Sequence, residues 1–222
     1  MKIEPVRVSD ISSLLFCQRY CYFNMLECVR KVSEMCALRE LYFSRRSNRE
    51  DWKDWARRKF LELYGEEHED IFSLAVKSFK YSKDVSELES VEIDIDIRRD
   101  DLRLAGRLDE VVFDGEKRVL ILSSKAPKEG VWYSDRIRLA AFSMLTSLRG
   151  GYVYYCKSGE LRKYEVTGKD RHTVLKCVER VEKLRNGFLP EKKEKKESKK
   201  CKNCVYRDVC EESGETFASK FL

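Results

Sequence analysis

The sequence predicts an α/β fold of the α+β kind, in which helices surround a mixed central sheet. Apolar residues recur at the helical period of 3.6 up to about residue 79, and after Ser90 they alternate with polar residues at the strand period of two. Strand and helix patterns then alternate to about residue 188, which is typical of a helix-covered sheet. A cluster of cysteines near the C-terminus predicts a small additional module.

The composition indicates a globular protein with a real core and a heavily charged surface. Of the 222 residues, 42% are hydrophobic and 38% are charged, and the formal net charge is +6. The basic excess is compatible with a nucleic-acid partner. No apolar run approaches the ~20 residues that span a bilayer, and the first residues lack the apolar core of a signal peptide. We therefore expect a cytoplasmic protein without membrane contact.

Residues 1–88 are expected to form an N-terminal helical region. Ser9 or Asp10 can cap a first helix that continues through Cys17 and Cys21. Because these two cysteines are four residues apart, they are expected on one face of that helix.

The rest of this region has helical periodicity with one start signal. Residues 28–46 fit a helix with a bend, and a further helix is expected from about Asp70 to Phe79. Between them, the segment Ser47-Asn48-Arg49-Glu50 matches a capping box. It precedes a stripe at helical spacing that we interpret as core packing: Trp52, Trp55, Ala56, Phe60 and Leu63.

Residues 89–188 are expected to form the α/β core. Alternation from Val91 to Ile97 predicts a half-buried strand. Two further strands are expected at 102–113 and 118–125, joined by the Asp114-Gly115 turn, and the apolar run in the second predicts burial on both faces. The remaining elements are expected in the order helix at about 133–148, strand at 152–156, hairpin partner or edge strand at 161–166, and helix at about 169–184.

Residues 189–222 are expected to form a charged tether and a cysteine module. The run at 191–200, EKKEKKESKK, is typical of a solvated linker, and its lysines can add salt-sensitive affinity for phosphate. Cys201, Cys204 and Cys210 follow, with two and then five residues between them.

Three thiols at this spacing are the larger part of a metal site. A thiolate site for zinc or for an iron–sulfur cluster usually has four ligands. Cys17 is the best candidate for the fourth, with Cys21 as the alternative, and such a centre would tie the two ends of the chain together. The other cysteines are interpreted as buried small hydrophobic residues: Cys28, Cys36, Cys156 and Cys177.

A second candidate site combines Asp109 with Lys125. The two residues belong to neighbouring predicted strands, and their phases allow a carboxylate and an ammonium to lie side by side at one end of the sheet. A metal-dependent nuclease needs carboxylates to hold Mg²⁺ or Mn²⁺ and a lysine to orient water and stabilise charge on phosphate. Taken alone, an aspartate and a lysine in these places are more typical of a protein surface.

The cysteine set and the strand pattern together resemble the CRISPR-associated, RecB-like exonuclease family, the iron–sulfur branch of the PD-(D/E)xK nucleases. The resemblance spans nearly the whole chain. Cys17 in LLFCQRYCYF looks like the N-terminal cluster cysteine, and Gly106-Arg107-Leu108-Asp109 looks like the metal-binding aspartate motif. The C-terminal triplet of the family is matched by Cys201, Cys204 and Cys210.

This resemblance implies a RecB-like, restriction-endonuclease-type core and a 4Fe-4S cluster held by those four cysteines. It implies a role in CRISPR spacer acquisition, with single-stranded or end-containing DNA and the CRISPR integrase complex as partners. Zinc competes for the cysteine site, since four cysteines also make a structural zinc site. Zinc ribbons pair two short Cys-x-x-Cys knuckles, whereas this chain has one, which together with the resemblance favours the cluster.

Three positions depart from the family pattern. Ser123 stands where the acid of the acid-x-lysine motif belongs, although Lys125 is present. Arg138 and Phe142 stand where the family has a glutamine and a tyrosine. The helical region around Trp52 lacks the family's histidine ligand, and the chain's two histidines, His68 and His172, are interpreted as exposed or structural.

These departures predict a DNA-binding protein with impaired catalysis, in which Arg107, Lys125 and Arg138 make the former active-site cleft more positive. An alternative is an active Mg²⁺- or Mn²⁺-dependent exonuclease for single-stranded DNA, in which a displaced acid or histidine completes the site around Asp109. The candidates for that replacement are Asp94, Asp96, Glu110 and His68. A third function stays open, a metal-clamped protein-interaction module without a DNA role.

Overall fold

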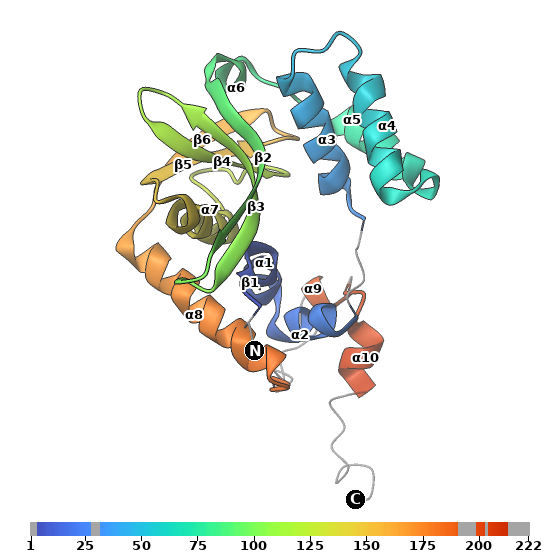
Figure 1. Ribbon diagram of the computed structural model, residues 1–222. Coiled ribbons are helices and arrows are strands. Elements are labelled where there is room, and N and C mark those ends of the chain that lie inside the picture. Colours follow the sequence, from blue (N-terminus) through green and yellow to red (C-terminus); the bar gives the residue numbers. More distant parts are fainter. Residues whose placement is uncertain (1–3, 28–31, 191–198, 203, 213–222) are drawn as a thin grey trace, which may run out of the picture.

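The computed structural model describes residues 4–27, 32–190, 199–202 and 204–212. At its centre lies a mixed six-stranded sheet (Figure 1). The strand order is β1-β3-β4-β5-β6, and β2 also pairs with β3. The strands are β1 (Val6–Arg7), β2 (Glu89–Arg99), β3 (Leu104–Phe113), β4 (Lys117–Ser123), β5 (Gly150–Tyr155) and β6 (Glu160–Glu165). The β1–β3 and β4–β5 pairs are parallel and the others antiparallel, so the mixed α/β prediction is confirmed.

Helices cover both faces of this sheet. One face packs against α1 (Val8–Phe16), α7 (Tyr133–Thr146) and α8 (Gly168–Arg185). The other packs against α3 (Glu34–Arg46), α4 (Trp52–Tyr64), α5 (Glu69–Ser78) and the short α6 (Lys83–Glu87). No helix in the described part of the chain combines the length and the apolar character needed to cross a membrane.

Strand β4 confirms the expected burial on both sides. Val119 and Ile121 pack with the α1–α7–α8 core, whereas Leu120 and Leu122 pack with the α3–α5 core, and all four are buried. A strand with helices on both faces needs apolar residues at successive positions, which explains its unbroken apolar run.

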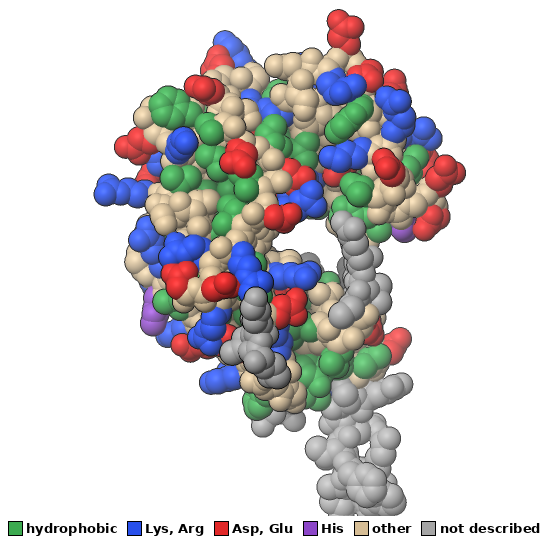
Figure 2. Space-filling view, in the orientation of Figure 1, with side chains coloured by type: hydrophobic (Ala, Val, Ile, Leu, Met, Phe, Trp, Pro, Cys, Tyr) green, Lys and Arg blue, Asp and Glu red, His purple; other side chains and the backbone are tan. Residues whose placement is uncertain are grey.

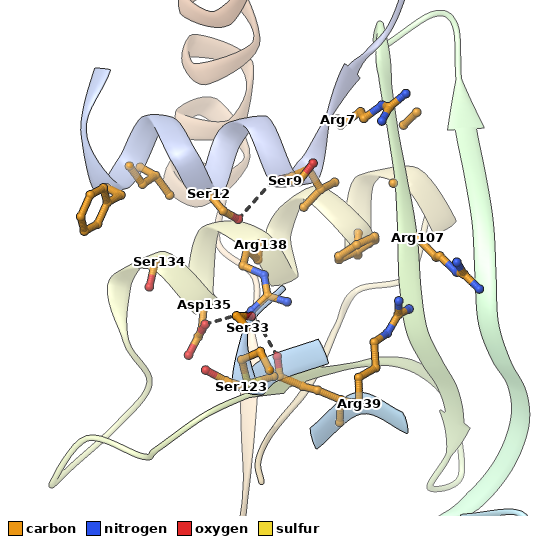
Figure 3. A pocket seen from close by; sticks show the side chains of 18 of the residues that line it. Arg7, Ser9, Ser12, Ser33, Arg39, Arg107, Ser123, Ser134, Asp135 and Arg138 are labelled. Carbon is orange, nitrogen blue, oxygen red and sulfur yellow. Dashed lines mark hydrogen bonds and ion pairs between the residues drawn. The ribbon is translucent and has the colours of Figure 1, made fainter. Parts of the chain in front are cut away.

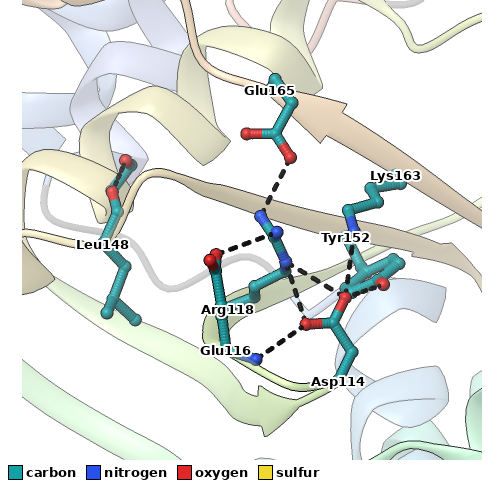
Figure 4. Close-up of polar contacts among 8 residues, drawn as sticks. Asp114, Glu116, Arg118, Leu148, Tyr152, Lys163 and Glu165 are labelled. Atoms are coloured by element: carbon teal, nitrogen blue, oxygen red, sulfur yellow. Dashed lines mark hydrogen bonds and ion pairs between the residues drawn. The ribbon is translucent and has the colours of Figure 1, made fainter.

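The turn between β3 and β4 is held by an ionic network (Figure 4). The Asp114 carboxylate accepts hydrogen bonds from the Tyr152 hydroxyl at 2.5 Å, Lys163 Nζ at 3.0 Å and Arg118 Nε at 3.0 Å. Burial by itself raises the pKa of Asp114, but these donors outweigh it and hold the pKa well below its usual range. The network ties β5 and β6 to the turn, while Arg118 also reaches Glu165.

The N-terminal helix differs from the prediction. Two helices replace one, α1 and α2 (Gln18–Glu27), and Cys17 lies between them with extended backbone angles, φ −165° and ψ 136°. Cys17 is therefore exposed while Cys21 is buried, and the two do not share a helix face.

The predicted capping box at residues 47–50 was wrong. Ser47 ends α3, and its hydroxyl donates to the Phe43 carbonyl, so it is not available to cap the next helix. Helix α4 begins instead at Trp52, after Asp51.

In α4 the core interpretation holds for Ala56 and Phe60, which are buried, and for Trp52, which packs against the same core. Trp55 is half-buried, with Arg49 and Lys59 against its ring, and Leu63 is 45% exposed.

The C-terminal module begins inside the predicted tether. Of the tether at 191–200, residues 191–198 lie outside the described residues, and α9 (Lys199–Lys202) contains the last two. The second helix of the module is α10 (Arg207–Glu212). Figure 1 shows both helices beside α2, so the described part of the C-terminal module lies against an N-terminal helix.

Candidate nucleic-acid interface

A cleft of about 1210 Å³ opens between α1, α3, α7 and the first half of β3 (Figure 3). In the space-filling view this face is hollowed near its centre, and Lys and Arg side chains border the hollow together with some carboxylates (Figure 2). The charged lining of the cleft has six cations and two carboxylates: Arg7, Arg39, Arg98, Arg107, Arg138 and Lys200 against Asp96 and Asp135. Its hydroxyl donors are six serines: Ser9, Ser12, Ser33, Ser123, Ser124 and Ser134.

The cleft forms where one edge of β3 changes partners. Strand β2 pairs along almost all of β3, so β1 and β4 share the other edge. Pairing with β1 ends at Ala105, and pairing with β4 begins at Glu110. Of the four residues between them, Gly106 and Arg107 line the cleft, whereas Leu108 and Asp109 are buried.

Gly106 allows helices to approach this part of the strand closely. A Cβ atom at residue 106 would lie 2.8 Å from Val8 Cγ2 and 2.9 Å from Phe142 Cε1. Side chains do not tolerate contacts this short, so only glycine lets α1 and α7 pack here.

At the same level, β2 and β3 both rotate about their axes. Ile93 packs with the α3–α5 core and Ile95 with the α1–α7–α8 core, although residues two apart in a strand normally share a face. Asp94 between them has a φ of +61°, which produces the rotation. Strand β3 changes face between Leu108 and Glu110, because Leu108 packs on the α1 side and Glu110 contacts Tyr42 of α3.

Asp94 and Asp109 therefore occupy facing positions. The pairs Ile93–Glu110 and Ile95–Leu108 bracket them in the β2–β3 ladder.

Both carboxylate oxygens of Asp109 are engaged. Its side chain is 8% exposed, Oδ1 accepts from Arg39 Nε at 2.8 Å, and Oδ2 accepts from the Leu122 backbone N–H at 2.8 Å. The β3–β4 ladder has already ended at the pairing of Glu110 with Leu120. Asp109 thus accepts a hydrogen bond from the buried Leu122 N–H, which has no partner in the β3–β4 ladder.

Arg39 links two carboxylates. While its Nε donates to Asp109, its Nη2 donates to Asp94 Oδ1 at 2.8 Å. Arg107 forms a bidentate ion pair with the same Asp94, in which Nε donates to Oδ1 at 2.6 Å and Nη2 donates to Oδ2. The hydrogen bond and charge of Asp94 raise the pKa of Arg107, against the opposing effect of its partial burial. The result is a line of alternating charges, Asp109–Arg39–Asp94–Arg107.

The structure does not bring Lys125 to Asp109. Strand β4 ends at Ser123, so Lys125 is two residues past the strand; its side chain is exposed and lies outside the cleft lining. Its carbonyl accepts a hydrogen bond from Trp132 Nε1 at 2.8 Å. The cation beside Asp109 is Arg39, from a helix 70 residues earlier. Ser123 lines the cleft.

Of the four possible replacement ligands, only Asp94 lies next to Asp109, and Arg39 sits between them. Asp96 lines the cleft. Glu110 is fully buried toward the other core, where it accepts from the Tyr42 hydroxyl at 2.5 Å and from Arg46 Nε at 2.7 Å. His68 belongs to the 3-10 turn Glu66–His68 between α4 and α5, with Glu67 as its neighbour at 3.9 Å.

The residues around Asp109 do not fit a divalent cation. Mg²⁺ needs several oxygen ligands in near-octahedral geometry at 2.0–2.1 Å. Here both Asp109 oxygens accept hydrogen bonds, the second carboxylate is bound to two arginines, and Ser123 offers a neutral hydroxyl. In the described part of the chain, no set of three His, Cys, Asp or Glu side chains is arranged to hold a metal ion.

The two arginines proposed for DNA binding both line the cleft. Arg107 is half exposed, and Arg138 Nη1 donates to the Leu122 carbonyl at 3.2 Å and to Asp135 at 3.3 Å. Arg39 was missed by sequence reasoning. The available signal was a charged residue inside the apolar helical run MCALRELYF, but periodicity does not indicate which strand such a residue contacts.

The cysteine module is anchored on α2 by aromatic packing. Tyr206 is buried, with ring centroids 5.4 Å from Tyr20 and 5.8 Å from Phe23. Arg19 of the same helix donates to the carbonyls of Cys210 at 3.1 Å and of Pro190 at 3.3 Å. These contacts bring the C-terminal triplet to the helix that begins immediately after Cys17.

The four proposed cluster ligands are all at least partly accessible. Cys17 and Cys201 are exposed, and Cys204 and Cys210 are half-buried. Burial raises the pKa of Tyr20 on α2, and the charge of Cys204 raises it further. Thiolates are the usual ligands of iron–sulfur clusters, so the chemistry of these four donors fits such a cluster. In this structure, however, the four described side chains are not arranged around a common metal position.

Cys21, the alternative ligand, does not fit. It is fully buried, its thiol donates to the Asp10 carbonyl at 3.4 Å, and burial, reinforced by the charge of Asp10, raises its pKa to about 12. A metal ligand must be a thiolate, which this environment disfavours. Among the other cysteines, Cys156 and Cys177 are buried as expected, Cys36 is half-buried, and Cys28 lies outside the described residues.

A curated protein of the archaeon Archaeoglobus fulgidus, described only as an uncharacterized protein, is 34% identical to this chain over 218 residues. The match covers 98% of this chain and 100% of the archaeal protein. The chain belongs to the family of that protein. No family model matches the chain. A solved structure described as the crystal structure of SSO0001 is 17% identical and covers 93% of this chain and 98% of its own, with a TM-score of 0.36.

Proposed function

We propose that this protein binds DNA in the cleft beside β3 and does not cleave it. The observation that carries the proposal is the position of Arg39 between Asp94 and Asp109, with one hydrogen bond of 2.8 Å to each. Asp109 is the carboxylate that the resemblance assigns to the metal ion, and Asp94 is the candidate replacement for the missing second acid that lies next to it. The guanidinium of Arg39 supplies positive charge to both carboxylates, as a metal ion would. Unlike a metal ion, it cannot coordinate a water molecule or a phosphate oxygen and so cannot activate water for attack.

The lining of the cleft supports a phosphate-bearing ligand. Six cationic side chains outnumber the two lining carboxylates, and serine hydroxyls lie between them. Arginine, lysine, serine and backbone donors make most protein contacts to nucleic-acid phosphates. The excess of cations remains when Asp94 and Asp109 are counted.

The sequence resemblance supports DNA as the polymer and CRISPR spacer acquisition as the setting, with the integrase complex as partner. In this proposal the protein holds single-stranded or end-containing DNA for a partner. The experiments below distinguish this proposal from two alternatives. One is an active exonuclease, and the other is an interaction module without a DNA role.

The proposal includes a 4Fe-4S cluster held by Cys17, Cys201, Cys204 and Cys210. When bound, the cluster would supply a covalent clamp between the two ends of the chain. Tyr206 and Arg19 already place the triplet on α2. Iron and sulfide analysis of anaerobically purified protein tests it, with four of each expected per chain. A colourless protein that contains zinc would overturn this part of the proposal.

The test of DNA binding is fluorescence anisotropy with a labelled oligonucleotide between 50 and 200 mM salt in EDTA. We expect log Kd to rise linearly with log salt, and Arg138→Gln to lower the slope by ~0.7 to 0.9, one phosphate contact. Arg171→Gln is the matched control, because Arg171 is an exposed arginine on α8 outside the cleft lining. Its slope should equal that of the wild type. Salt-independent binding, or no binding, would contradict a DNA role.

Cleavage is measured in parallel on single-stranded and duplex DNA with Mg²⁺ or Mn²⁺. We expect the wild type to degrade neither substrate above the background of the Asp109→Ala variant. Robust metal-dependent degradation that Asp109→Ala abolishes would establish the exonuclease instead.

A further inference from the structure

We infer that Arg39 and Arg107 form one clamp for a single phosphate of the bound strand, and that Asp94 is the positioning residue that holds both. The inference rests on the proposed function and adds a defined subsite to it. The clamp is built by α3, β2 and β3, which meet at the side of the cleft (Figure 3).

Each of the two guanidiniums has one amino group that is not used in these hydrogen bonds. Arg39 uses Nε for Asp109 and Nη2 for Asp94, and Arg107 uses Nε and Nη2 for Asp94. Within the described residues, the Nη1 amino group of each arginine has no hydrogen-bond partner. Both arginines line the cleft, and their side chains are 24% and 50% exposed. A phosphate has enough acceptor oxygens to take both remaining donors.

Asp94 is what allows two like charges to stay close. Its carboxylate accepts three hydrogen bonds, one from Arg39 and two from Arg107, and its side chain is 21% exposed. Without that negative charge the guanidiniums would repel each other, and Arg107, which is half exposed, would turn into solvent. The carboxylate of Asp94 is thus expected to promote the binding of a phosphate, whereas a carboxylate ordinarily repels an anion.

The backbone at Asp94 makes a clean test possible. Its φ of +61° lies in the left-handed region, which asparagine adopts about as readily as aspartate. Asp94→Asn therefore removes the charge without straining β2. Asp96→Asn is the matched control, because Asp96 is an exposed carboxylate on the same strand that also lines the cleft. None of the ion pairs among the described residues involves Asp96.

The two variants are expected to change oligonucleotide affinity in opposite directions. Asp94→Asn should weaken binding about five- to tenfold, because two charge-assisted contacts lose their geometry. Asp96→Asn should strengthen it about twofold, because Asp96 accepts no hydrogen bond from either arginine, although its charge acts on Arg107, and its removal lessens repulsion of the phosphates. Arg107→Gln should weaken binding as much as Asp94→Asn. The double variant Asp94→Asn/Arg107→Gln should bind no more weakly than either single variant, because each single change already disables the same clamp.

Anisotropy at fixed salt measures these affinities, and circular dichroism confirms that each variant is folded. If Asp94→Asn strengthens binding as Asp96→Asn does, Asp94 contributes only charge and the clamp is refuted while the proposed function stands. Additive losses in the double variant would refute it equally. If the wild type does not bind the oligonucleotide, the proposed function itself fails.

Competition identifies the source of the phosphate. An unlabelled oligonucleotide should displace the probe, whereas a mononucleotide at equal phosphate concentration should not, because one clamp is only part of the cleft. Displacement by the mononucleotide with equal strength would overturn the assignment to a nucleic-acid strand.

Discussion

Removing the arginine that bridges Asp94 and Asp109 tests the centre of the site. Arg39→Met keeps the length of the side chain and takes away its charge and its donors. It leaves Asp109, 8% exposed, with one carboxylate oxygen unpaired, while the Leu122 N–H still binds the other. Breaking a buried ion pair costs about 3–5 kcal/mol and an exposed pair about 0–1 kcal/mol. Since Arg39 is 24% exposed, we expect about 2–3 kcal/mol.

Urea unfolding monitored by circular dichroism measures this loss, which corresponds to a Tm about 5–10 °C lower for a chain of this size. A double-mutant cycle isolates the pair. Asp109→Asn should cost less than Arg39→Met, because Arg39 keeps its bond to Asp94. The double variant should be about 1–2 kcal/mol more stable than the sum of the single losses. Additivity within ~0.5 kcal/mol would show that the contact contributes no coupling energy and would refute the reasoning.

The same variant tests whether Arg39 occupies a position where a cation is needed. Because Arg107 still engages both oxygens of Asp94, the test adds Arg107→Gln. In Arg39→Met/Arg107→Gln the carboxylates of Asp94 and Asp109 face each other without an arginine, so Mn²⁺ should bind to this double variant and not to the wild type. At ten times its Kd, Mn²⁺ would restore about 1.4 kcal/mol. Equal stabilisation of both proteins by Mn²⁺, or of neither, would contradict this account.

Three further predictions concern the scaffold. Thr167, Tyr164 and Arg136 hydrogen-bond Asp170 and, against the opposing effect of burial, lower its pKa from 3.8 to about 2. Its contribution of about 2 kcal/mol should be complete above pH 4 and lost as the pH falls from 4 to 2, a loss that acid titration of Asp170→Asn should lack. Gly151→Ala should prevent stable folding, because the new Cβ would lie 1.8 Å from the Val119 carbonyl oxygen, and soluble expression would disprove it. Tyr206→Ala should release the cysteine module from α2, seen as faster proteolysis after Pro190 with an unchanged Tm for the core, and an unchanged proteolysis rate would show that other contacts hold the module.

Most secondary structure follows from local patterns. The strand from Val91 to Ile97 was predicted from alternation and the doubly buried β4 from its apolar run, because both patterns are local properties of a strand. The single buried face that alternation predicts for the first strand was wrong, because the rotation at Asp94 directs Ile93 and Ile95 to different cores. The break at Cys17 was not predicted, because residues on both sides of it have helical periodicity and only packing decides that the helix divides there. Ser47 shows the same limit, since its hydroxyl serves the helix before it.

For the candidate site, the sequence by itself determined which residues are unusual: an aspartate on a buried strand, a serine in place of an acid, and cysteines at both ends of the chain. Only the tertiary structure decided which charge faces Asp109. The contact between Arg39 and Asp109 spans 70 residues and depends on how α3 packs against the sheet and on the rotation of β2 and β3 at Asp94. Periodicity describes the faces of one element, whereas a pairing between elements is a property of the whole packed core.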